Sequence, residues 1–146
     1  MLAAFTVICV VLRATEAEDV SALAGLGRRS PLLAASLTLS MVSLAGIPPL
    51  AGFFGKFLMI KAAAEQGPSF YWLIAVAIVG VVISLYYYFG VVRAIYWAQE
   101  PAGLSPIVVP WPMRISLGVC MLGMLWLGVY PNTLLNLVGN SLVMSR

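Results

Sequence analysis

One uncharged stretch, residues 31–55, constrains the fold most. If residues 31–64 formed one continuous helix, it would be about 50 Å long, whereas the hydrocarbon core of a bilayer is about 30 Å thick. Gly46-Ile47-Pro48-Pro49 lies inside this stretch. The two prolines remove two N–H donors and crowd the preceding turn, which frees the carbonyls of Leu44 and Ala45. We therefore predict a helix interrupted at Gly46–Pro49.

The composition of the whole chain indicates a membrane protein. Of the 146 residues, 62% are apolar and 9% are charged, whereas soluble domains carry roughly 25% charged residues. The sequence therefore predicts an all-α integral membrane fold. A net charge of +3 is too small and too scattered for a nucleic-acid surface.

The chain offers few residues for metal or disulfide chemistry. It contains no histidine, and both cysteines, Cys9 and Cys120, lie in apolar runs. This excludes a zinc-like ligand set, a haem attachment motif and a disulfide framework. We expect no metal and no cofactor bound by this chain.

Four apolar segments are expected. Residues 1–12 are too short to span a bilayer, which needs about 20 residues, and they resemble the end of a truncated helix. Residues 31–64 form the broken helix, and residues 70–97 span once, with aromatic pairs at both ends. Residues 113–138 form the last helix, with a stop or kink near Pro131. Residues 13–30 are expected to be a solvated connector.

The basic residues are distributed unevenly between the two sides that these segments define. Their excess marks the cytoplasmic side, so the C-terminus is predicted to lie outside. The basic residues on the first side are Arg13, Arg28, Arg29, Arg93 and Arg114, and those on the second are Lys61 and Arg146.

Lys56 is the most informative ionisable residue. If the segment is helical, Lys56 lies about 7.5 Å deeper in the membrane than Lys61. One interpretation is a lysine that snorkels along its apolar stem to the nearer interface. The other is a buried amine that faces a helix interior or a water path, which Gly52 and Gly55 favour because they permit close backbone approach.

The break and the nearby hydroxyls each have two interpretations. The break is either a simple proline kink or an opening that exposes carbonyls and a helix dipole to water. The stripes of small and hydroxyl residues either pack helices closely or support a chain of waters. The stripes are Ser36, Ser40 and Ser43 in the second segment, and Gly80, Ser84, Tyr87 and Tyr88 in the third.

Residues 39–57, followed by Ser84-Leu85-Tyr86-Tyr87-Tyr88, resemble a known family. The stretch contains Gly46-Ile47-Pro48-Pro49 and Gly52-Phe53-Phe54-Gly55-Lys56-Phe57, and it is similar to the subunit N family of NADH-quinone oxidoreductase. That family is one of the antiporter-like proton-translocating subunits of respiratory complex I. The likeness covers nearly the whole chain but only about the last third of the family's length.

The resemblance implies a function and a set of partners. Lys56 would match the lysine of the family's discontinuous twelfth helix, a proton-relay position, and Gly46–Pro49 would match its interruption. NADH, FMN, iron–sulfur clusters and quinone would be held by other subunits, and this chain would not be an enzyme on its own. The expected location is the bacterial cytoplasmic membrane, among lipid and the other membrane subunits.

One departure from the family pattern limits this expectation. The acid and lysines of the family's earlier helices have no counterpart in this sequence, so the missing N-terminal part is expected as a partner. Two other hypotheses remain: a subunit of a multisubunit cation/proton antiporter of the same fold, and a small membrane scaffold. A scaffold would not need Lys56 at depth.

Overall fold

The computed structural model describes residues 1–15, 20–98 and 106–130, and these residues form helices, turns and connecting segments. Two helical stretches, Pro68–Trp97 and Trp111–Val129, are long and apolar enough to cross a membrane. The α-helices are α1 (Leu2–Thr15), α2 (Leu26–Arg29), α3 (Pro31–Ala45), α4 (Ala51–Glu65), α5 (Tyr71–Trp97) and α6 (Trp111–Val129), with 3₁₀ turns η1 (Val20–Leu23) and η2 (Pro68–Phe70).

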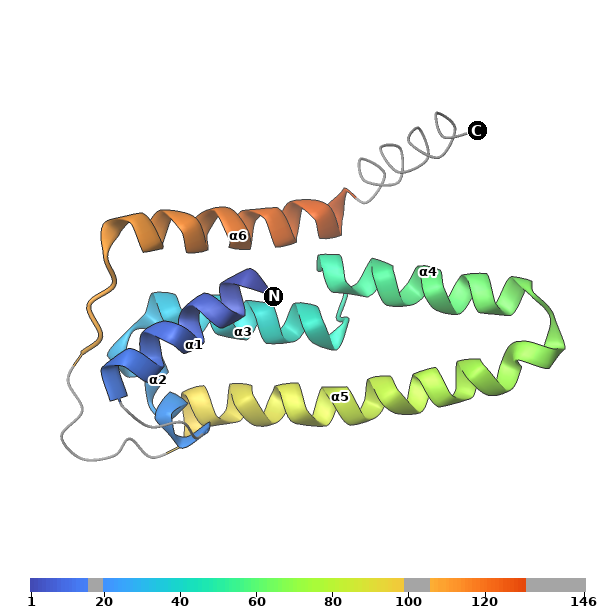
Figure 1. Ribbon diagram of the computed structural model, residues 1–146, viewed down its shortest axis with the longest axis horizontal. Helices are drawn as coiled ribbons and strands as arrows, with labels where there is room; N and C mark the ends of the chain where they lie inside the picture. The colour runs from blue at the N-terminus through green and yellow to red at the C-terminus, as the bar shows by residue number, and fades with distance from the viewer. Residues whose placement is uncertain (16–19, 99–105, 131–146) are drawn as a thin grey trace.

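Helices α3 and α4 follow one another along the long axis of the molecule (Figure 1). Each has 15 residues, which is about 22 Å and too short to cross a bilayer alone. The interruption between Ala45 and Ala51 coincides with the position expected from Gly46–Pro49. Helix α5 turns back alongside both half-helices, and α6 also contacts both.

The core lies at the end of the bundle where α1, α3 and α5 meet. Apolar side chains from these helices and from α6 pack together there, including Val7, Leu33, Leu37, Ile95 and Leu117. This core holds α3 in place, so the half-helix that leads into the break has a fixed position.

The expectation of a solvated connector over residues 13–30 is wrong for the part that the structure describes. Residues 20–29 fold into η1 and α2, where Ala22 and Leu26 are buried. Gly25, with a φ of 68°, makes the turn between them, a backbone conformation that glycine adopts without strain. The acidic residues Glu16, Glu18 and Asp19 lie outside the described residues.

The last helix ends before the predicted range does. Helix α6 begins at Trp111 and ends at Val129, and residues 131–138 of the predicted segment lie outside the described residues. In the first turn of α6, the Arg114 Nε donates at 3.1 Å to the carbonyl oxygen of Val109, which lies in the loop before the helix. This bond ties the first turn of α6 to the preceding chain.

Charge is separated along the axis of the bundle. Arg13 lies in the last turn of α1, Arg28 and Arg29 lie in α2, and Arg93 lies near the end of α5. Helices α1 and α5 end, and α6 begins, at the same end of the molecule (Figure 1). Lys61 lies near the opposite end, 3.8 Å from Glu65. The fold thus gathers the described arginines at one end.

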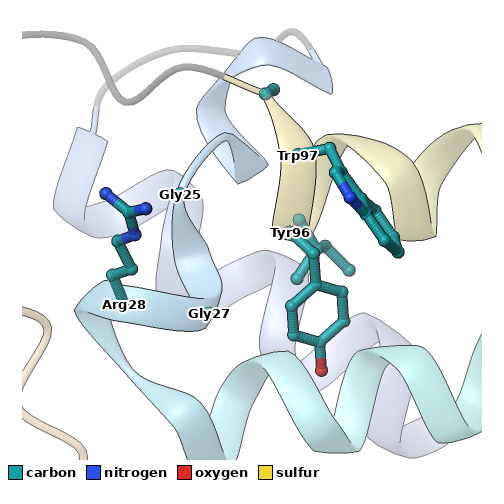
Figure 2. A pocket seen from close by; sticks show the side chains of 7 residues that line it. Gly25, Gly27, Arg28, Tyr96 and Trp97 are labelled. Atoms are coloured by element: carbon teal, nitrogen blue, oxygen red, sulfur yellow. The ribbon is translucent and has the colours of Figure 1, made fainter.

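The arginine-rich end holds a cavity of about 600 Å³ between α2 and the end of α5. Figure 2 shows Tyr96 and Trp97 on one side of it and Arg28 on the other. A Cβ placed on Gly27 would lie 3.0 Å from the Tyr96 ring, so the glycine permits this close packing. The elements that line the cavity, α2 and the end of α5, lie at the opposite end of α3 from the break (Figure 1).

Candidate functional site: the broken helix and Lys56

The end of α3 is a Schellman motif. Gly46 adopts a φ of 86°, its N–H donates to the Ser43 carbonyl at 3.1 Å, and the Ile47 N–H donates to the Val42 carbonyl at 3.3 Å. A left-handed glycine with these two bonds is a common way to end a helix. The motif provides donors for two of the last four carbonyls of α3.

Lys56 provides donors for the other two carbonyls. Its Nζ lies 2.9 Å from the Leu44 carbonyl oxygen and 3.1 Å from that of Ala45. In a continuous helix these carbonyls would accept from residues 48 and 49, which are both proline here and have no N–H. The amine therefore occupies the place of the two missing donors.

The position of the Lys56 amine bears on the two interpretations of this residue. Lys56 lies one turn and a half into α4, and its side chain turns back toward the break rather than toward Lys61. A cation at the C-terminus of α3 also interacts favourably with the negative end of the helix dipole. The geometry therefore favours the interior interpretation over snorkelling.

Gly52 brings the two half-helices into direct contact. A Cβ on Gly52 would overlap the Ser43 carbonyl oxygen, and the Gly52 N–H donates to the Ser43 hydroxyl at 3.3 Å. Gly55, in contrast, has no atom within 4 Å of such a Cβ. The expected close approach is therefore present at Gly52 and absent at Gly55 within the described chain.

The small-residue stripe of α3 packs against its neighbours. Ser36, Ser40 and Ser43 are all buried. The Ser36 hydroxyl donates to Leu32 at 2.8 Å and lies 3.4 Å from the Met121 sulfur of α6, while the Ser40 hydroxyl donates to Ser36 at 2.8 Å. The stripe therefore serves close packing, and its strongest hydrogen bonds stay within the helix.

The hydroxyls of α5 do not contact Lys56 in the part of the chain that the structure describes. Ser84 donates to the Gly80 carbonyl of its own helix at 2.7 Å. Tyr87 is 68% exposed, and Tyr88 packs against the core formed by α1 and α3. Their expected role beside a chain of waters stays a prediction.

Sequence reasoning missed Gly128, which brings α6 onto the break. A Cβ on Gly128 would overlap the Pro49 carbonyl oxygen. Three glycines are spaced five residues apart in α6, at positions 118, 123 and 128, and nothing in the local sequence distinguishes the one that makes this contact.

The described residues contain no group of three or more histidine, cysteine or acidic side chains that would hold a metal ion. What the break brings together is one amine and the carbonyls of Leu44 and Ala45.

Comparison with known proteins gives the site a context. Residues 1–84 match the family model described as NADH:quinone oxidoreductase/Mrp antiporter, TM. The NADH-quinone oxidoreductase subunit N of Dehalococcoides mccartyi is 38% identical over 137 residues, which are 94% of this chain and 28% of that protein. Subunit N 2 of Acidobacterium capsulatum is 42% identical over 137 residues, covering 92% of this chain and 28% of that protein.

A solved structure shares the fold as well. Respiratory complex I from Thermus thermophilus with bound aureothin contains a chain that aligns with a TM-score of 0.67 and 34% identity, over 77% of this chain and 26% of that one. The present chain thus spans between a quarter and a third of the length of these relatives. By its sequence and its fold, the chain belongs to the NADH:quinone oxidoreductase/Mrp antiporter transmembrane family.

Proposed function

We propose that this chain acts as the C-terminal part of a subunit N-type, antiporter-like subunit in the membrane arm of NADH-quinone oxidoreductase, where it takes part in proton translocation. The two relatives described above, which carry this name, match 94% and 92% of the chain. Its membrane-spanning character follows from the family and from its apolar helices.

The observation that carries the proposal is the contact between the Lys56 amine and the carbonyls of Leu44 and Ala45. An ammonium group has three N–H donors, and these two bonds leave one for water or for a group on another element. Irregular backbone at membrane depth is tolerated where it lines water or is buried in protein. We propose that Lys56 exchanges a proton at the break, and the two contacts of its amine with the end of α3 support this proposal.

A lysine can do this only if its charge responds to its neighbours. Like charges nearby disfavour the ammonium form and carboxylates favour it, so a charge shift elsewhere in the assembly would load or release the proton. α3 contains no charged residue, and the described acid on α4 is Glu65, bound to Lys61. We propose that the controlling charges come from the part of the relatives' length that this chain does not span.

The proposed assembly includes partners that bind what this chain does not. Other subunits would hold NADH, FMN, iron–sulfur clusters and quinone, and this chain would be a non-redox part of the enzyme. The proposed location is the bacterial cytoplasmic membrane. The alternative, a subunit of a cation/proton antiporter, is supported by the breadth of the family model, whereas the names of the two relatives described above favour the oxidoreductase.

Lys56→Ala and Lys56→Arg in the complete complex test the proposal. Lys56→Ala should lower proton pumping and the coupled quinone reduction, with complex content nearly unchanged. Lys56→Arg should not restore full pumping, because guanidinium remains protonated. Lys61→Ala is the matched control, because Lys61 is exposed on the same helix.

Proton-to-electron ratio, turnover and complex content measured together decide the outcome. If Lys56→Ala keeps the wild-type ratio and turnover at matched content, Lys56 is not a relay residue. Sodium-dependent transport without quinone reduction in the wild-type assembly would instead support the antiporter.

A further inference from the structure

The end of α6 lies directly on the backbone of the break. A Cβ built on Gly128 would overlap the Pro49 carbonyl oxygen and would lie 2.7 Å from the carbonyl carbon and the Cα of Leu50. Gly128 and Leu50 are both buried, and Figure 1 shows the end of α6 beside the start of α4. Glycine is therefore required here for space.

The neighbouring glycines of α6 do not share this requirement. At Gly118 and Gly123 a Cβ would meet no atom within 4 Å. Glycine costs a helix interior about 1 kcal/mol relative to alanine, so each of these positions weakens α6. At Gly128 the weakening coincides with a backbone contact that no larger residue permits.

The contact is connected to Lys56 through a short chain of backbone. Pro49 and Leu50 lead directly into α4, whose second residue, Gly52, contacts Ser43 of α3. Lys56 lies one turn after Gly52, with its amine on the carbonyls of Leu44 and Ala45. The contact of α6 with Pro49 and Leu50 therefore constrains the same short segment that sets the distance from the Lys56 amine to those carbonyls.

We propose that Gly128 is a positioning residue for Lys56: it lets α6 rest on Pro49 and Leu50 and so holds the break in the geometry in which the amine meets the carbonyls of α3. This inference rests on the proposed relay function of Lys56. It assigns to α6 a part in proton transfer, although α6 contributes no titratable group to the contact.

Gly128→Ala and its control Gly123→Ala in the complete complex test the proposal. Non-bonded carbon atoms prefer about 3.5 to 4.0 Å, so the added methyl would displace α6 or the break by roughly 1 Å. A displacement of about 1 Å at a reacting group costs up to about 10²-fold in rate. Because the backbone relaxes partly, Gly128→Ala should lower pumping about three- to tenfold, whereas Gly123→Ala should pump like the wild type.

A double variant separates positioning from general packing. If Gly128 acts through Lys56, Gly128→Ala combined with Lys56→Ala should pump no less than Lys56→Ala alone, because coupled sites are not additive. Additive losses, or a Gly128→Ala variant with the wild-type proton-to-electron ratio, would overturn the proposal. The proton-to-electron ratio does not depend on how much complex assembles, so it can be measured even on a small yield of the variant complex.

Thiol labelling tests the contact between α6 and the break independently of proton pumping. With Cys9 and Cys120 replaced by serine, Leu50→Cys should react slowly with N-ethylmaleimide while Gly128 is present, because Leu50 is only 3% exposed. Gly128→Ala should speed this labelling about tenfold, as local opening exposes the site, and Gly123→Ala should not. Rapid labelling with Gly128 intact would overturn the inference even if Gly128→Ala never assembles.

The labelling and the pumping measurements also distinguish failure of the relay function of Lys56 from failure of the positioning role of Gly128. If Lys56→Ala pumps normally, the relay function of Lys56 fails, yet labelling still reports whether Gly128 closes the break. If Lys56→Ala is impaired and Gly128→Ala is not, only the positioning role fails.

Discussion

At the scale of single residues, the site is a matter of matching donors to acceptors. Two prolines at 48 and 49 leave two carbonyls of α3 without backbone donors, and one amine supplies both bonds. The sequence predicts which carbonyls are freed, because the i to i+4 spacing of the helix is fixed. It does not predict that Lys56 reaches them, since that depends on the offset between two half-helices.

Gly46→Ala should destabilise the assembled complex. A non-glycine residue in the left-handed region costs about 1–2 kcal/mol, and the new Cβ would lie 3.0 Å from the Lys56 Cδ. Gly55→Ala, whose Cβ meets no atom within 4 Å, is the control and should be neutral or stabilising.

The measurement is the temperature at which the complex loses activity in each variant. If Gly46→Ala and Gly55→Ala have the same inactivation temperature, Gly46 does not hold the described conformation.

At the scale of helices, α3 and α4 are separate because Pro48 and Pro49 have no N–H to continue the helical hydrogen bonds. Sequence reasoning finds the interruption because a Pro-Pro pair leaves a local signal. It gives the wrong account of residues 20–29, because the acidic residues just before them suggested solvent while Ala22 and Leu26 fill the end of the core. It also misses Gly128, since contacts between distant segments leave no local pattern.

Replacing both prolines of the break with alanine should release Lys56. The new N–H groups at positions 48 and 49 would compete for the carbonyls of Leu44 and Ala45, so the amine loses its partners although the lysine is present. Pumping should then fall toward the level of Lys56→Ala at matched complex content. Pro68→Ala, at the far end of α4 in η2, is the control.

Proton pumping in membrane vesicles gives the answer. A double-alanine variant that pumps like the wild type would show that the amine does not need those two carbonyls.

At the scale of the whole molecule, the chain presents large apolar faces that another surface must cover in the assembly. Helix α5 has one fully buried residue, Ile95, and Tyr86 and Tyr87 are exposed. The exposed face is consistent with lipid and with the remaining helices of longer relatives, which this chain matches over about 28% of their length.

The separation of charge predicts the orientation in the membrane. The arginines gather at one end of the bundle, and the positive-inside rule assigns that end to the cytoplasm. A reporter inserted near Gly25 should therefore map to the cytoplasmic side, and one fused after Arg146 should map outside. Reporter activity in intact cells measures both positions, and the reverse pattern would refute the assignment.

The contacts of α5 and α6 with both α3 and α4 have a mechanical consequence. Helix α5 runs unbroken past the break and packs against both half-helices, and the end of α6 lies on the break itself. The half-helices are therefore not free to bend about the break as a hinge. Any conformational change at the break would then involve only side chains, water and a few backbone groups. On the proposed relay function of Lys56, a proton would arrive and leave while the frame of the bundle keeps its shape.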